Sequence, residues 1–365
     1  MTALLEPLQA DLLASAFLQD EAAVPAWRRW RDSVDWEAHL DPDAFALLPA
    51  VYRNLRRLGV DDPLFPRFKG IVRQSWLQNQ RHIAALGPTL TSCARSQVEV
   101  LMLPPTSLWA IDPTAMLVPG RLHHWAVAPA DAERAIRCLQ ENGWRSSRIR
   151  LPPALLPGFV RGSRHLFLER SDDQRIVLTW GLEYWFDGRA RQVWDRAVTV
   201  DLGGHAIRIL DPTDALEFVL RQSAAGAWLR RMGAVLTIVS AGERVEWNRL
   251  LGELRTCPLP PSWEGGLRFL QSYLVDRAGA SVPLHRCCGE RSPAGIDSAG
   301  GGGWMARARQ DWAAYRRSWG DDYRPTAALV QMPGYLMGRW QLRGASQLLR
   351  GLYGWMRYDQ RRSVP

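Results

Sequence analysis

The chain has 365 residues, of which 47% are hydrophobic and 23% are charged, and its formal net charge is +9. This composition is typical of a globular protein long enough for two or three domains, and it excludes a low-complexity or fibrous chain. No apolar run approaches the roughly 20 residues that a membrane-spanning helix needs. The acidic N-terminal segment lacks the basic head of a signal peptide, so we expect a cytoplasmic protein without a transmembrane segment.

Arginine supplies nearly all of the positive charge, because Lys69 is the only lysine. Two explanations fit this high arginine content. A genome rich in G and C would encode arginines spread over the whole chain, as they are here, and the functional alternative is an anionic partner. Eighteen tryptophans, many beside arginines, suit either binding surfaces or buried anchors. The five cysteines are irregularly spaced without a C-x-x-C pair, which predicts free thiols.

Residues 1–95 predict an N-terminal helical domain, because leucines and tryptophans recur at helical spacing. Asp41 followed by Pro42 predicts the cap and first turn of a helix that ends near Gly59. A long helix is expected from about Arg67 to Ala94.

Residues 96–210 predict a mixed core of strands and helices. A short strand over 98–103 is followed by two prolines, a brief helix starting near Thr106, and a second strand over 122–127. The later expected elements are a helix over 129–142, a loop over 151–162, a strand pair over 165–169 and 176–180, and a hairpin over 194–200 and 204–210 that turns at Gly203-Gly204.

The C-terminal part divides into three predicted segments. Residues 211–282 predict a helical bundle that Asp211 and Pro212 open. Residues 283–303 are rich in Gly and Ser and predict a flexible linker. Residues 304–365 predict a tail rich in Trp and Arg, with a basic amphipathic helix that either contacts a partner or membrane surface or packs back on the protein's own helices.

The order of strand, turn, short helix and strand, with the sequence around it, resembles the bacterial family of uncharacterised nucleotidyltransferases. The resemblance covers roughly residues 30–255, including Tyr52-Arg53-Asn54-Leu55, Phe68-Lys69-Gly70 and the strand-to-helix junction at 127–135. It implies an α+β fold, in which a nucleotidyltransferase-like mixed β-sheet core lies between an N-terminal helical domain and C-terminal helices. In that family the first strand ends in Leu-Lys-Gly, and the second carries two Asp residues that hold metal.

The chain departs from the family at each of these places. Pro104 and Pro105 stand for Lys and Gly, Leu122 and His124 stand for the two Asp residues, and Val177 stands for a Glu that is a plausible third ligand. Magnesium prefers hard oxygen ligands, which these side chains do not offer, and prolines lack the N–H groups of a phosphate cradle. We therefore predict no metal cofactor.

The predicted function is a pseudoenzyme that acts as a binding or accessory protein in a peptide-modifying or polysaccharide pathway. Its ligand would be a protein, a peptide or a nucleotide, held in the vestigial cleft. The ligand-binding candidates there are Thr106, Ser107, Arg121 and His124.

Two alternatives remain open at this point. One is an active nucleotidyltransferase with relocated ligands and magnesium, for which the catalytic candidates are His123, His124, Asp112 and Glu169. Strand alternation places His123 and His124 on opposite faces, so the pair alone does not make a metal site. The other is a nucleic-acid-binding protein, suggested by the net charge of +9, although no basic stretch is dense enough to favour it over the first two readings.

Overall fold

The fold is α+β, with one mixed six-stranded sheet. The computed structural model describes residues 6–38, 40–111, 122–146, 153–170, 174–182, 186, 188–222, 228–241, 245–256, 259, 263–278, 284–288 and 335, with the backbone alone at 276–278 and 285–286. Asp112, Arg121, nearly all of the predicted linker and the predicted tail except Tyr335 lie outside these residues. Within them, no helix combines the length and apolar character that a bilayer crossing requires.

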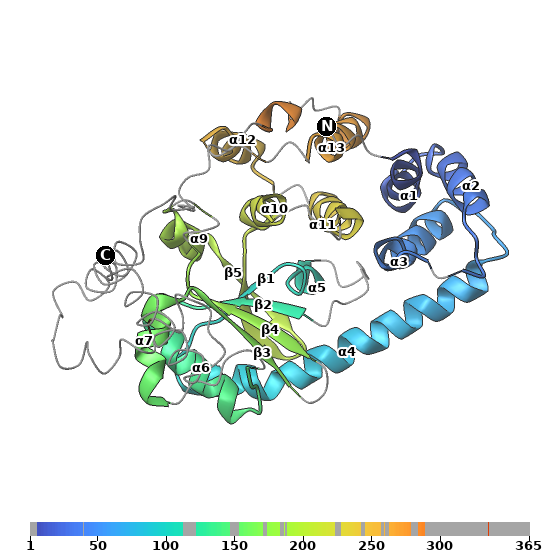
Figure 1. The fold of residues 1–365 in the computed structure, drawn as a ribbon. Coiled ribbons are helices and arrows are strands. Elements are labelled where there is room, and N and C mark those ends of the chain that lie inside the picture. Colours follow the sequence, from blue (N-terminus) through green and yellow to red (C-terminus); the bar gives the residue numbers. More distant parts are fainter. Residues whose placement is uncertain are drawn as a thin grey trace, which may run out of the picture. The chain divides into compact units, whose positions relative to one another are not determined.

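The described elements follow one another from the N-terminus as labelled in Figure 1. The helices are α1 Pro7–Phe17, α2 Ala23–Ser33, α3 Pro42–Arg57, α4 Phe65–Arg95, α5 Leu108–Ile111, α6 Ala132–Glu141, α7 Leu156–Gly162, α9 Ala190–Arg196, α10 Pro212–Arg221, α11 Trp228–Ser240, α12 Trp247–Thr256 and α13 Glu264–Ala278. The strands are β1 Leu101–Leu103, β2 Leu122–Ala126, β3 His165–Glu169, β4 Arg175–Thr179, β5 Val198–Leu202 and β6 His205–Ile209. Short 3₁₀ turns occupy Pro129–Asp131, Pro153–Leu155 and Leu284–Cys287.

The sheet has the strand order β3-β4-β2-β1-β6-β5. β3 and β4 are antiparallel, with His165 opposite Thr179, and β1 runs parallel to β6. β5 and β6 form the predicted hairpin, in which Gly203 and Gly204 have φ angles of 62° and 83°. Positive φ at both turn residues suits the twist of a two-residue hairpin, which explains the pair of glycines.

The chain forms two compact units, each discontinuous in sequence. The first takes its described residues from Met1–Gly87, Leu101–His124 and Leu182–Ser292, and the second takes its described residues from Pro88–Val100, Trp125–Gly181 and Pro293–Pro365. In the first unit, α1 packs on α2 and α3, and α11 packs on α3 and α10. In the second unit, α6 packs on α7, and β3 pairs with β4.

Two aspartates cap helices of the first unit as the sequence predicts. Asp41 accepts hydrogen bonds from the amides of Asp43 and Ala44 at the start of α3. Asp211 does the same for α10, with both donor nitrogens at 3.1 Å. Each cap satisfies amides that the first helical turn leaves without an intrahelical partner.

An aromatic cluster fills the core near the N-terminus of the first unit. The rings of Trp27, Trp30, Trp36 and Phe68 have centroids 5.6–6.2 Å apart in tilted and edge-to-face pairs. Trp27 and Trp30 are 1% and 4% exposed. These two tryptophans, which lie among arginines in the sequence, are therefore buried anchors.

A network of ion pairs surrounds α10 in the same unit. Glu217, which is buried, accepts hydrogen bonds from Arg189 at 2.6 Å and from Arg221 at 2.7 Å. Arg189 also pairs with Glu253 at 3.0 Å. One turn earlier, the buried carboxylate of Asp214 accepts two hydrogen bonds from the guanidinium group of Arg196, a bidentate pair with both distances 2.9 Å.

Two sequence expectations for local structure are wrong. Trp194, expected to begin a strand, lies in α9, and β5 begins only at Val198. The segment expected to be a loop over 151–162 contains α7, whose Leu156 and Phe159 are buried. In both cases packing of apolar side chains selects a short helix that the sequence pattern does not predict.

Candidate functional site

The turn after β1 is the first candidate site, because it holds the residues of the predicted cleft. Pro104 and Pro105 lack an N–H and are joined by a cis peptide bond. The three amides after Thr106 are already engaged: Ser107 donates to Leu103, Leu108 donates to Pro105, and Trp109 donates to Thr106. The turn therefore presents no open row of amides to an anion, unlike a glycine-rich phosphate loop.

Thr106 and Ser107, two of the predicted ligand-binding residues, are 1% and 0% exposed. The Thr106 hydroxyl and His123 Nδ1 lie 3.0 Å apart and share a buried hydrogen bond. The Ser107 hydroxyl has no hydrogen-bond partner among the described residues. The Thr106 side chain links the turn to β2, and both side chains are closed off from solvent.

His123 and His124 face opposite sides of β2, as strand alternation predicts. His123 is fully buried, and its ring lies edge-to-face with His82 and Trp109, with centroids 5.8 and 6.2 Å away. His124 and Leu122 share the other face and are half-buried. Burial lowers the pKa of His124 to about 4, so its imidazole is neutral at physiological pH.

The remaining sequence candidates belong to the second unit or lie outside the described residues. Glu169 belongs to the second unit, where its backbone pairs with that of Arg145 at 2.8 Å in both directions. Val177 and Thr179 lie in β4 of the same unit, and the Thr179 hydroxyl donates to the carbonyl of Arg164. Asp112 and Arg121 lie outside the described residues.

Leu122 and His124 form the face of β2 opposite His123, which we call the outer face. Their side chains do not fit a magnesium ion. Leu122 is a hydrocarbon, and neutral His124 offers one nitrogen, a ligand that suits zinc or copper better. Over the part of the chain that the structure describes, no three His, Cys, Asp or Glu side chains gather closely enough to hold a metal.

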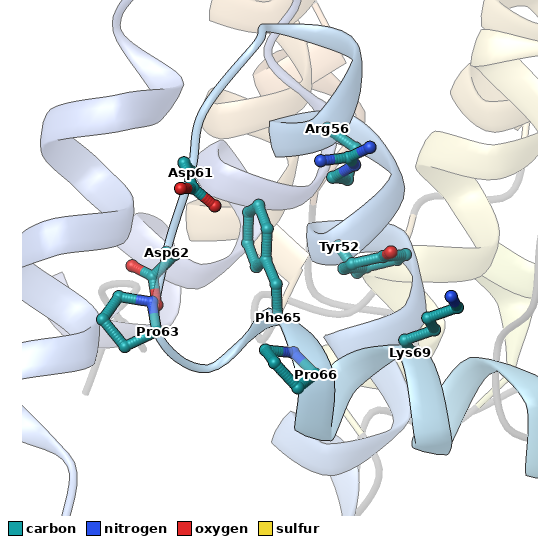
Figure 2. Close-up of a pocket in the computed structure, with 8 residues that line it drawn as sticks. All are labelled: Tyr52, Arg56, Asp61, Asp62, Pro63, Phe65, Pro66 and Lys69. Atoms are coloured by element: carbon teal, nitrogen blue, oxygen red, sulfur yellow. The ribbon is translucent and has the colours of Figure 1, made fainter.

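A second candidate site is a pocket of about 640 Å³ in the first unit, between the end of α3 and the start of α4 (Figure 2). Its lining residues are Tyr52, Arg56, Asp61, Asp62, Pro63, Phe65, Pro66 and Lys69. The volume lies within the range of roughly 300–1,000 Å³ that is typical of small-molecule sites.

The buried Asp62 organises the base of this pocket. Its carboxylate accepts hydrogen bonds from the indole of Trp27 at 2.8 Å, from Arg31 at 2.9 Å and from the amide of Leu64 at 3.0 Å. Burial alone would raise the pKa of Asp62, but these three donors outweigh it and hold the pKa below its usual value. The charge of Asp62 is therefore satisfied inside the protein.

The sequence did not single out this pocket as a site, although its parts follow helical spacing. Tyr52 and Arg56 are four residues apart on α3, and Phe65 and Lys69 are four residues apart on α4, so each pair shares one helix face. The approach of the two faces is decided by helix packing and leaves no local pattern.

Comparison with models of protein families, with curated proteins and with solved structures gave no significant match. The residues of the two candidate sites are therefore the observations that bear on function.

Proposed function

We propose that this protein is a pseudoenzyme of nucleotidyltransferase-like descent that works by binding, as an accessory protein in a biosynthetic pathway. The single observation that carries the proposal is the outer face of β2. There, Leu122 and a neutral His124 stand where the family that the chain resembles has two metal-holding Asp residues. Nucleotidyl transfer needs carboxylates that converge on divalent ions to neutralise phosphate oxygens. Neither side chain can supply that charge.

The turn after β1 supports the same proposal independently. The amides of Ser107, Leu108 and Trp109 are bonded to preceding carbonyls, and the two residues before Thr106 are prolines. A triphosphate would have to break these bonds to be held there. Loss of the metal-holding groups together with the phosphate cradle favours a binding role over a transferase with one altered residue.

Purified protein incubated with labelled nucleoside triphosphates, Mg²⁺ or Mn²⁺ and candidate peptide or sugar acceptors tests the proposal. We expect no labelled acceptor above that of a reaction without protein. Transfer that disappears in a His124→Ala variant but persists in a Thr179→Ala variant would overturn it, because the outer face of β2 would then be catalytic.

A further inference from the structure

We propose that the pocket between α3 and α4 binds a small organic anion, one that carries a single carboxylate or phosphate on a planar apolar body. This inference deepens the proposed binding role and rests on it, since it names a ligand class for a protein that we expect to bind and not to catalyse. The pocket lies wholly within the first unit, and all of its lining residues are described.

The cationic side of the pocket comes from two helices. Arg56 projects from the last turn of α3, and Lys69 projects from the second turn of α4. Both side chains are exposed, and neither forms an ion pair with any carboxylate among the described residues. With Asp62 already neutralised, these two positive charges outnumber the one other carboxylate of the lining, Asp61, and the excess favours an external anion.

The start of α4 adds to this preference. The N-terminus of a helix carries a partial positive charge, which favours anions near the first turn. Phe65 and Pro66 of that turn line the pocket. The helix terminus and the two cationic side chains therefore act in the same direction.

An aromatic pair gives the pocket its apolar surface. The rings of Tyr52 and Phe65 meet edge-to-face with centroids 5.3 Å apart, and Figure 2 shows them between the loop and Lys69. Phe65 is 6% exposed, whereas Tyr52 is half-buried. Tyrosine offers a flat apolar ring with a hydroxyl at its end, which suits a planar ligand that also carries a polar group.

The acidic side of the pocket limits the ligand to one negative end. Asp62 is neutralised by Arg31 and Trp27, but Asp61 is exposed on the loop, on the side away from Lys69 in Figure 2. An anion that binds beside Lys69 lies across the pocket from Asp61, so the other end of the ligand can face that carboxylate. A second negative charge at that end would be repelled, so a dianion with charges at opposite ends of a ring should bind less well.

The pocket walls are also held in place before a ligand arrives. Asp62 ties the loop to the aromatic cluster through Trp27, and Phe68 of that cluster contacts Phe65 at a centroid distance of 6.4 Å. A pocket built on packed helices loses little freedom when it binds.

Isothermal titration calorimetry with four probes tests the proposal: benzoate, phenyl phosphate, benzyl alcohol and terephthalate. We expect benzoate or phenyl phosphate to bind with a dissociation constant on the order of 1 mM, as is reasonable for probes of this size. The neutral benzyl alcohol and the two-ended terephthalate should each bind about tenfold more weakly. The tighter-binding of benzoate and phenyl phosphate, which each carry one anionic group, identifies that group.

Two variants and one matched control locate the binding. Arg56→Gln and Lys69→Gln should each weaken binding of the tighter-binding of these two probes by about tenfold, because each removes one charged contact. Arg73→Gln makes the same charge change one turn further along α4, at an exposed residue that does not line the pocket, and should leave the affinity unchanged.

Three results would overturn the proposal: neither benzoate nor phenyl phosphate binds, benzyl alcohol binds as tightly as these anions, or Arg73→Gln weakens binding as much as the two pocket variants. Inorganic phosphate that binds as tightly as phenyl phosphate would also contradict it, because the aromatic pair would then contribute nothing. The transfer assay reports on β2 and the titration reports on the pocket, so either can fail while the other holds.

Discussion

Replacing Glu217 tests the reasoning about buried charge most directly. Its carboxylate is 2% exposed and accepts from Arg221, whose side chain is 3% exposed, at 2.7 Å. It also accepts from Arg189 at 2.6 Å. A Glu217→Gln change keeps the shape of the side chain but removes the negative charge that both guanidinium groups face.

The expected cost follows from the burial of the partner. Removing one member of a buried ion pair typically costs about 3–5 kcal/mol, because the other charge is left uncompensated away from water. Arg189 keeps Glu253 at 3.0 Å and Arg221 keeps the carbonyl of Glu253 at 3.4 Å, so neither guanidinium group loses every partner. We therefore expect the free energy of unfolding to fall by about 3 kcal/mol, the lower end of that range.

Urea unfolding followed by circular dichroism measures this loss as a shift of the transition midpoint. Glu264→Gln is the matched control, because its partner Arg268 is 63% exposed at a distance of 2.7 Å. An exposed pair contributes only about 0–1 kcal/mol. If Glu217→Gln shifts the midpoint no more than Glu264→Gln, then burial of the network does not determine its contribution, and the reasoning is refuted.

Three further predictions concern other parts of the chain. Burial holds the pKa of folded His124 at about 4, against 6.5 when exposed, so the unfolded state binds more protons between these two pH values. The free energy of unfolding should therefore fall by at most about 3 kcal/mol as the pH drops from 6.5 to 4. A His124→Gln variant, measured by urea unfolding from pH 4 to 7, should lose this part of the pH dependence. Cys93 and Cys138 are buried, and burial raises the pKa of Cys93 to about 12. Iodoacetamide at pH 8 should therefore label both cysteines much more slowly in folded than in unfolded protein. Equal labelling rates in the two states, measured by peptide mass mapping, would contradict this. A side chain at Gly162 would collide with the backbone of Tyr335, so Gly162→Ala should speed tryptic cleavage beyond residue 300, whereas an unchanged rate would show that this packing is unimportant.

The sequence by itself was sufficient to predict those local features whose physical cause lies within a few neighbouring residues. Asp41 and Asp211 cap the helices that follow them, because a carboxylate two and three residues before an amide can reach it. Gly203-Gly204 turns the β5–β6 hairpin through positive φ angles that glycine adopts without strain. The opposite orientation of His123 and His124 follows from strand alternation alone. The mixture of helices and strands could also be predicted from local patterns, whereas the mixed sheet was expected only from the resemblance to a family.

The tertiary structure decided what depends on residues far apart in the chain. Thr106 reaches His123 across 17 residues, and both side chains are buried where they meet. Trp194 is helical because Val193 beside it packs inward, which no local pattern indicates. The α3–α4 pocket exists only where two helix faces meet, and Glu217 acquires Arg189 from 28 residues away. Local spacing determines which side chains share a face, whereas the burial of that face, and the partners it meets, depends on packing against the rest of the chain.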